Sequence, residues 1–324
     1  MFNNFYKDLL SPSEKDVYNK MLEGFKELST SVKIYSQNEL DINKVFQYVL
    51  MDNVDIYYIY QFKYTYNYET KMYCIMPIYT IDSYLKDQYD KNIKEMKLKI
   101  WREVKSMNKW EAVLKLHDYI CVNVKYTDFG DNAHTLLGPL LQGRGVCDGI
   151  SKMFKYLCNE IFVQSLYVTG KAIGGINNKE EGHAWNKVNL NNEWYQMDVT
   201  FDIGSSDNKT CSHRYFMVPD KLLKSTHKED YPSNGVLCVS DELSYFHKKN
   251  IEVNSVRETV DLIKNHILNN EYVFEIYFKY VKNSELLDTI SKCMNKVCNE
   301  LNKNLSYVIN YTNDSNTVTI KCEK

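Results

Sequence analysis

Residues 143–149 read Gly-Arg-Gly-Val-Cys-Asp-Gly, and apolar residues at helical spacing follow directly. This spacing predicts an amphipathic helix whose buried face carries Ile150, Met153, Phe154, Leu157, Cys158 and Ile161. The glycines on either side of Cys147 permit a sharp turn, so its thiol is expected at the first turn of that helix. The helix dipole and the free backbone N–H groups there favour the thiolate, whereas the neighbouring carboxylate of Asp148 opposes it. The alternative is that Cys147 only packs at a helix start, as most free cysteines do.

Two alternating segments follow, at residues 184–190 and 193–199, with Asn191-Asn192 between them. Because asparagine tolerates positive φ, this pattern predicts a β-hairpin with a two-residue turn. One face of the hairpin is apolar apart from Asn186, as a core-facing side requires. The apolar residues of that face are Ala184, Val188, Leu190, Tyr195, Met197 and Val199.

The other face of the hairpin carries His183 and Asp198. If Leu190 pairs with Glu193, then His183 faces Thr200, and the side chains of His183 and Asp198 lie diagonally within reach of each other. A three-residue turn would shift the register by one residue and separate them. The proximity of the two side chains therefore depends on the length of the turn.

A cysteine at a helix start, with a histidine and a carboxylate side by side on a neighbouring hairpin, is the arrangement that nucleophilic catalysis requires. The histidine takes the thiol proton, and the carboxylate fixes the histidine tautomer and stabilises the imidazolium. Cys147, His183 and Asp198 are therefore the candidate catalytic residues.

Three blocks of the sequence resemble the signature blocks of the transglutaminase-like superfamily, in the same order and at similar spacing. They are residues 145–149 (Gly-Val-Cys-Asp-Gly), 182–186 (Gly-His-Ala-Trp-Asn) and 194–202 (Trp-Tyr-Gln-Met-Asp-Val-Thr-Phe-Asp). The resemblance covers about residues 110–220, and the ends of the chain are only faintly similar to flanking regions of bacterial members. It implies an α+β, papain-like core in which the helix carrying the cysteine packs on an antiparallel sheet.

The same resemblance implies that Cys147 is the nucleophile, His183 the general base and Asp198 the orienting acid. The family includes crosslinking transglutaminases, cysteine peptidases, amidases and members that have lost activity. The expected substrate is therefore a peptide or protein with a glutamine or another amide, and no cofactor is expected. The acyl acceptor, an amine or water, is left open. The alternative is a catalytically silent module that binds peptides or serves as a scaffold.

An oxyanion formed on the substrate needs hydrogen-bond donors, and the backbone N–H of Cys147 is the natural first one. Three side chains, Gln142, Trp185 and Trp194, are further candidates for substrate contact. Gln142 lies roughly where papain-like peptidases place a glutamine, although it also suits a solvated helix end. Trp185 and Trp194 share the predicted catalytic face, where they wall a substrate groove or pack in the core.

No metal site is expected. Cys211-Ser212-His213 supplies too few ligands for zinc, and no second pair lies at zinc spacing. Residues 128–131 lack the series of oxygen ligands that an EF-hand needs for calcium. His117 and Asp118 are expected at the surface or in a loop.

Composition limits the partners of the chain. Its 324 residues carry 40 Lys+Arg against 42 Asp+Glu, so nucleic acid is not an expected partner. The N-terminal residues lack a signal-peptide pattern, and no apolar run is long enough to span a bilayer, so a cytoplasmic location without membrane contact is expected. Nine cysteines without a C-x-x-C pair do not indicate a disulfide framework. The oligomeric state is not indicated.

The chain divides by pattern into three parts. Residues 1–108 are expected to form an α+β N-terminal region, 109–222 the catalytic core, and 223–324 a small α/β module. Ser11, Pro12 and Glu14 form a capping box that predicts a helix up to about Leu28. The polar segment 221–235 is expected to be a linker or a long loop.

Overall fold

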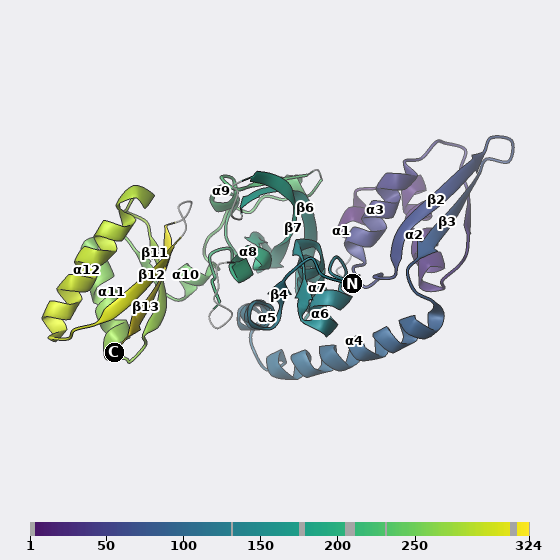
Figure 1. Ribbon diagram of the computed structural model, residues 1–324. Coiled ribbons are helices and arrows are strands. Elements are labelled where there is room, and N and C mark those ends of the chain that lie inside the picture. The colour runs from purple at the N-terminus through teal and green to yellow at the C-terminus, as the bar shows by residue number, and fades with distance from the viewer. Residues whose placement is uncertain are drawn as a thin grey trace.

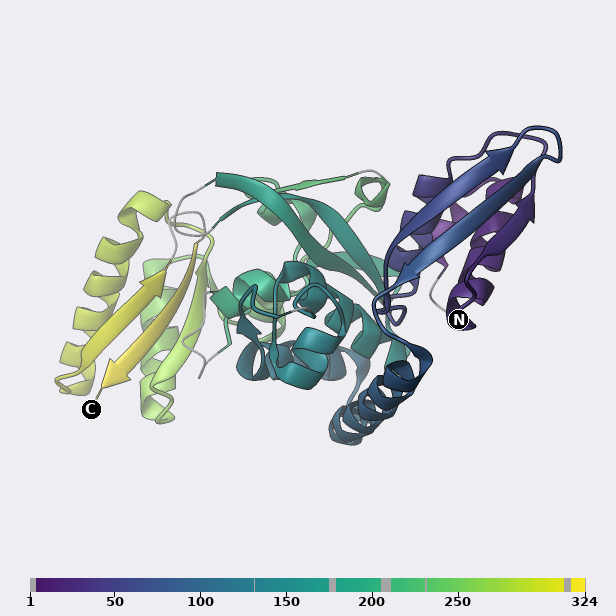
Figure 2. The ribbon, with the colours of Figure 1, turned by 45° about the vertical axis from the view of Figure 1, so that its right-hand side comes forward.

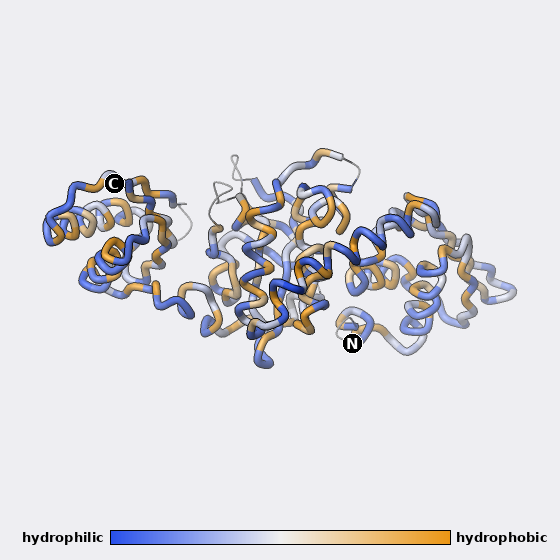
Figure 3. The backbone as a smooth tube through the Cα atoms, turned by 90° about the horizontal axis from the view of Figure 1, so that it is seen from below, coloured by the Kyte–Doolittle hydropathy of each residue, from blue (hydrophilic) through white to orange (hydrophobic). Residues whose placement is uncertain are grey.

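The computed structural model describes residues 4–130, 132–174, 179–204, 211–230, 232–311 and 316–323. Helices and strands are mixed throughout, so the α+β class is confirmed. Three parts lie in a row, with the N-terminal region at one end, the central core in the middle and the C-terminal module at the other end (Figure 1). Along the helices, hydrophobic residues alternate with hydrophilic ones, as amphipathic packing requires (Figure 3).

The N-terminal region packs helices on a three-stranded sheet of order β1-β3-β2. The capping box is present, since the Ser11 side chain accepts from the Glu14 N–H and the Glu14 carboxylate accepts from the Ser11 N–H. The helix it starts ends at Lys26, close to the predicted end. The elements are α1 (Phe5–Asp8), α2 (Pro12–Lys26), β1 (Val32–Tyr35), α3 (Ile42–Asp52), β2 (Ile59–Asn67) and β3 (Met72–Tyr79).

The N-terminal region is continuous with the central core. One hydrophobic cluster contains buried residues of both, from Tyr6 to Met217. The Tyr6 hydroxyl donates to the Tyr167 carbonyl at 2.5 Å. The long helix α4 (Ser83–Val104) runs from one part to the other and packs against helices of the core (Figures 1 and 2). The part before residue 109 therefore supports the core by direct packing.

The central core places one helix against a four-stranded antiparallel sheet of order β8-β7-β6-β9. The helix is α7, and its buried face matches the apolar pattern read from the sequence. Asn186, the polar residue on the otherwise apolar face of the hairpin, donates to the carbonyls of Ser151 and Leu166, both at 3.0 Å, and so joins helix and sheet. The elements are α5 (Lys109–Asn123), β4 (Lys125–Tyr126), α6 (Leu137–Gln142), β5 (Arg144–Gly145), α7 (Cys147–Glu160), β6 (Gln164–Gly174), β7 (Lys179–Leu190), β8 (Glu193–Met197), α8 (Val199–Gly204), α9 (Asp220–Leu223) and β9 (His227–Glu229).

The C-terminal module has its own hydrophobic cluster, built from residues between Val253 and Cys322. Two helices pack with a four-stranded sheet of order β10-β11-β13-β12. Its mixture of helices and strands matches the small α/β module expected there. The elements are α10 (Tyr245–Lys248), β10 (Glu252–Val253), α11 (Val256–Leu268), β11 (Val273–Phe278), α12 (Leu286–Leu301), β12 (Ser306–Tyr311) and β13 (Thr317–Glu323).

The central sheet extends past the boundary expected at residue 222. Strand β9 pairs antiparallel with β6, with Ala172 opposite His227, so it is an edge strand of the core. The segment 221–235 is therefore not only a linker, because it also contributes a strand to the sheet that carries the candidate site. The polar composition that predicts a linker is also found in a short edge strand with one exposed face.

Candidate active site

The Cys147 side chain is half-buried and occupies the first position of α7. The preceding residue, Val146, is extended, and no side chain caps this end of the helix among the described residues. At a helix start without a side-chain cap, the first-turn N–H groups can stabilise an anion beside the thiol. This is the position that the glycine pattern predicts.

The structure explains why two positions near Cys147 are occupied by glycine. A Cβ on Gly149 would lie 2.4 Å from the Ala133 carbonyl oxygen, so only glycine lets the segment before α6 approach the start of α7. Gly143 has φ +62° and ends α6, a conformation that glycine adopts without strain. Together they bring the chain sharply from one helix into the next.

His183 and Asp198 are in direct contact. His183 Nε2 lies 2.8 Å from Asp198 Oδ2, and the side chains are 7% and 0% exposed. The Cys147 thiol lies near enough to the same imidazole to contribute to its raised pKa. Because Nε2 is held by the carboxylate, Nδ1 is the ring nitrogen expected to serve the thiol. The predicted contact of His183 with Asp198 is present, and the catalytic roles of the three residues stay a prediction.

The Asp198 carboxylate and the Cys147 thiol stabilise the imidazolium form of His183. Burial opposes protonation, but the Asp198 carboxylate and the Cys147 thiol together raise the pKa of His183 to about 10. Burial likewise opposes ionisation of Asp198, yet His183 and His227 hold its pKa well below the usual range. The site therefore holds a buried carboxylate next to a protonated histidine.

The predicted hairpin register is confirmed, but Asp198 does not reach His183 from within the paired strands. Leu190 pairs with Glu193 across a two-residue turn, and Asn191 and Asn192 have φ of 57° and 64°. The ladder stops at the pair Asn186–Met197, so the expected pair of His183 with Thr200 does not form. The chain turns into α8 there, and Asp198 reaches His183 from the residue between strand and helix.

A second histidine, His227, binds the same carboxylate. Its Nε2 lies 2.9 Å from Asp198 Oδ2, and its Nδ1 lies 2.8 Å from the Thr226 hydroxyl. The side chain is 1% exposed, so the contact is shielded from water. His227 could not be found from the sequence, because the segment that forms β9 has the composition of a linker and no spacing rule connects the residue to Asp198. The aspartate is thus anchored from two sides, which restricts how it can move against His183.

The charge of Asp148, which opposes a thiolate at Cys147, is compensated locally. Lys152 lies one helical turn further on, with its Nζ 2.7 Å from Asp148 Oδ1. The Tyr167 hydroxyl donates to the same oxygen at 2.7 Å. The unfavourable neighbour noted in the sequence therefore acts within a neutral ion pair.

We expect the substitution Lys152→Met to lower the rate at which iodoacetamide alkylates Cys147 at neutral pH by about 2- to 10-fold. The reason is that Asp148 would then lose its counter-ion and repel a developing thiolate. The rate is measured by mass spectrometry of the Cys147 peptide under limiting reagent. Lys86→Met is the matched control, because it removes an equivalent i,i+4 pair with Asp90 in the N-terminal region and should leave the rate unchanged.

Trp185 does not line a groove, which corrects its assignment as a substrate-binding residue. It is 0% exposed and packs in a cluster on the sheet face opposite α7, and its Nε1 donates to Gln196 Oε1 at 2.8 Å. Its ring stacks on His183 with centroids 5.8 Å apart, so it supports the imidazole from behind. Trp194 is half-buried and packs against the same cluster, near the turn of the hairpin.

Gln142 is exposed at the end of α6, and its amide oxygen lies 3.5 Å from Arg144 Nε. This favours the solvated helix end over the oxyanion donor. Tyr126, on β4, is a different polar group near the thiol. Burial, followed by the charges of Cys147 and Glu181, raises the pKa of Tyr126 to about 12, so its hydroxyl stays protonated and able to donate.

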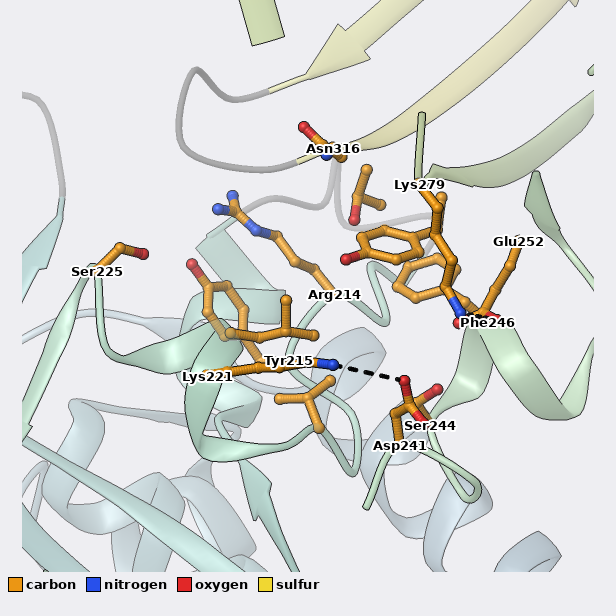
Figure 4. Close-up of a pocket in the computed structure, with 14 residues that line it drawn as sticks. Arg214, Tyr215, Lys221, Ser225, Asp241, Ser244, Phe246, Glu252, Lys279 and Asn316 are labelled. Carbon is orange, nitrogen blue, oxygen red and sulfur yellow. Dashed lines mark hydrogen bonds and ion pairs between the residues drawn. The ribbon is translucent and has the colours of Figure 1, made fainter. Parts of the chain in front are cut away.

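A cavity of about 490 Å³ lies between the core and the C-terminal module (Figure 4). Arg214, Tyr215 and Lys221 contribute to its core side, and Glu252 and Lys279 to its module side. None of the three candidate catalytic residues lines it. Tyr215 does connect it to the site, because its ring packs 5.8 Å from the ring of His227.

Comparison with known proteins confirms the resemblance seen in the sequence. Residues 94–199 match the family model described as the transglutaminase-like superfamily, and this range contains Cys147, His183 and Asp198. No curated protein matches the chain.

The solved structures that match the chain are distant. A proposed cysteine protease from Cytophaga hutchinsonii is 15% identical over 52% of this chain and 65% of its own, with a TM-score of 0.31. A structure described as a TGase is 15% identical over 63% of this chain and 61% of its own, with a TM-score of 0.32. A proposed protease from Parabacteroides distasonis is 14% identical over 42% of this chain and 36% of its own, with a TM-score of 0.24. The chain spans less than two thirds of the length of each.

Proposed function

Because residues 94–199 carry a transglutaminase-like core, we propose that this protein is a cysteine-dependent enzyme that transfers the acyl group of a peptide or protein amide. The observation that carries the proposal is the contact of His183 with the buried carboxylate of Asp198, beside the Cys147 thiol that raises the pKa of the same histidine. Such a set of residues activates a weak nucleophile in acyl transfer on unrelated folds.

The proposed reaction begins when the Cys147 thiolate attacks the amide carbonyl carbon. The carbonyl oxygen becomes an oxyanion, which the backbone N–H of Cys147 at the start of α7 is placed to stabilise, with the Tyr126 hydroxyl as a second candidate donor. His183 gives its proton to the leaving nitrogen, the C–N bond breaks, and ammonia or an amine departs. A thioester on Cys147 remains.

The second half returns the enzyme to its starting state. An incoming amine or water loses a proton to His183 as it attacks the thioester, and the thiolate leaves. An amine acceptor gives a new amide, which is a crosslink when both groups belong to proteins, and water gives hydrolysis. The contacts that carry the proposal are common to both outcomes, so the acceptor must be identified by experiment.

No helix among the described residues has both the length and the apolar character needed to cross a bilayer. The proposed substrate is defined by the chemistry of the site, as a glutamine side chain or a backbone amide in a peptide segment that fits beside a half-buried thiol.

The test is to incubate the protein with a set of glutamine-containing peptides, with and without a labelled primary amine, and to follow the products by mass. Incorporation of the amine identifies a transferase, conversion of glutamine to glutamate an amidase, and cleavage of the backbone a peptidase. Each product should be absent with Cys147→Ala. If no product and no Cys147 thioester forms with any peptide, the enzyme proposal is wrong and a peptide-binding module is favoured instead.

A further inference from the structure

A second cluster of metal-ligating side chains lies outside the candidate active site. Helix α5 supplies His117 and Asp118, and the segment after residue 210 supplies Cys211 and His213. Asp118 Oδ1 lies 3.0 Å from His117 Nδ1 and 3.0 Å from His213 Nε2. One ligand atom from each of the four residues lies within 4.8 Å of the other three. The expectation that His117 lies at the surface is wrong, because its side chain is 0% exposed.

The outer surroundings of the two histidines are those of metal ligands. His117 Nε2 lies 3.0 Å from Asp202 Oδ2, and His213 Nδ1 lies 2.7 Å from Glu275 Oε2. In each case the ring nitrogen that faces away from the cluster is held by a buried carboxylate. A carboxylate on the remote nitrogen fixes the tautomer and orientation of an imidazole and raises its basicity toward a metal. Finding this arrangement on both histidines is an observation independent of the ligand atoms themselves.

The cluster also concentrates charge in a poorly solvated place. Three carboxylates, from Asp118, Asp202 and Glu275, surround two histidines, and two of these carboxylates are buried. Charges taken out of water are costly unless a partner compensates them. A divalent cation at the centre would leave the histidines neutral and balance the negative groups around it.

We propose that His117 Nδ1, Asp118 Oδ1, Cys211 Sγ and His213 Nε2 bind one zinc ion. Zinc takes four ligands in a tetrahedron at about 2.0–2.3 Å, which sets the ligand atoms roughly 3.3–3.8 Å apart. The two 3.0 Å contacts and the 4.8 Å limit of the cluster bracket that spacing, so small side-chain rotations are sufficient. Two imidazoles and a thiolate select zinc over calcium or magnesium, which prefer oxygen ligands.

The proposed site is structural, because four protein ligands leave no open position for substrate. It would join three segments that are distant in sequence: α5 of the core, the segment at 211–213, and strand β11 of the C-terminal module, which provides Glu275. The Tyr245 ring covers His213 from the module side, with centroids 3.7 Å apart. Zinc would therefore fix the C-terminal module against the core.

The site is not visible in the sequence, because its ligands are not close together along the chain. Cys211 and His213 form a short pair, and their partners come from about 95 residues earlier in the sequence, at Asp118. Only the packing of α5 against the segment after α8 brings the four ligands together. The available signals were the pair Cys211 and His213 and the His117-Asp118 dipeptide, and each is weak alone.

The test measures zinc in the full chain, purified under reducing conditions with any affinity tag removed. Metal-free protein is prepared with a chelator, saturated with Zn²⁺, desalted and assayed by mass spectrometry for metal. We expect about one zinc per chain in the wild type and a loss in Cys211→Ser and His213→Gln. Glu275→Gln leaves all four ligands in place and should weaken zinc binding about 10- to 100-fold.

Cobalt provides a readout that misfolding does not mimic. Co²⁺ in the wild type should give the visible bands of a tetrahedral site and a thiolate charge-transfer band, and Cys211→Ser should lose the second while its circular dichroism is unchanged. Cys298→Ser, a half-buried cysteine on α12, is the matched control and should keep both. His227→Gln should also retain zinc, which separates this site from the cluster at the active site.

The proposal would be overturned if the saturated wild type held only substoichiometric zinc, or if Cys211→Ser bound zinc and Co²⁺ as the wild type does. It would equally be overturned if Cys211 were found in a disulfide with its neighbour Cys121 in the protein as purified under reducing conditions, since the ligand thiolate would be lost. None of these outcomes bears on acyl transfer, which is measured separately at Cys147.

Discussion

Replacing Cys147 by alanine is expected to lower acyl transfer by at least about 10³-fold, because the thiolate forms the only covalent bond to substrate in the proposed reaction. His183→Ala is expected to lower it by a similar factor, since the thiol then loses the group that accepts its proton. The wild type should show selective alkylation of Cys147 by limiting iodoacetamide at neutral pH. In His183→Ala that selectivity should fall about 10- to 100-fold.

The alkylation experiment has internal controls. Cys74 and Cys298 are also half-buried but lie far from any part of the proposed triad, so their rates report ordinary thiols of the same protein in the same tube. Their rates should be unchanged in His183→Ala. If Cys147 reacts no faster than Cys74, the claim that this thiol is activated is wrong, whatever the fold.

The substitution Asp198→Asn is expected to have the next largest effect, a loss of activity of about 10²- to 10⁴-fold. An amide of the same shape has no charge to stabilise the imidazolium, and its NH₂ group can hold His183 in the wrong tautomer. The activity is measured on the peptide found in the mass screen, with the fold of the variant checked by circular dichroism. Breaking the buried pair also costs about 3–5 kcal/mol of stability, so the assay is run well below the melting temperature.

The sign of the pH effect follows from the shift on His183. Departure of the leaving amine needs the protonated imidazole, whose pKa lies near 10, so the alkaline limb of the wild-type profile is expected near that pH. In Asp198→Asn the limb should move down toward the ordinary histidine value of about 6.5. The loss of activity in Asp198→Asn, measured as the ratio of the wild-type rate to the variant rate, is therefore expected to be larger at roughly pH 8 to 9 than at pH 6.

The same carboxylate makes the stability of the fold depend on pH. The raised pKa of His183 means that its contribution is complete below about pH 6.5 and is lost as the pH rises through about 10. The lowered pKa of Asp198 means that its contribution is present above about pH 4 and is lost in stronger acid. Asp198→Asn should therefore lose the most stability relative to the wild type between the acid limit set by Asp198 and the alkaline limit set by His183.

His227→Gln separates the two partners of Asp198. The variant keeps the contact of His183 with Asp198, so the alkaline limb should stay close to that of the wild type. Stability should fall by about 1.5–3 kcal/mol, the range for a hydrogen bond to a charged group. If His227→Gln moved the alkaline limb as far as Asp198→Asn does, the carboxylate would depend on His227 to act on His183.

Much of the candidate site was predictable because its signals are local. The glycines around Cys147 and the apolar face that follows predict a helix start, and the structure places the residue there. The Asn191-Asn192 turn sets the hairpin register by its own backbone preference, and the ladder keeps that register. Backbone preferences and side-chain periodicity act over a few residues, and a single sequence contains them in full.

What the sequence determined by itself is the mixed class of the fold and the pairing of His183 with Asp198, the two residues that we propose act with Cys147. What only the tertiary structure decided is everything that depends on a contact between distant segments. It makes β9 an edge of the central sheet, which brings His227 to Asp198, and it buries Trp185 behind the imidazole. It also gathers His117 and Asp118 with Cys211 and His213. The physical reason is that burial and side-chain contact are properties of the packed chain, whereas local pattern is written residue by residue.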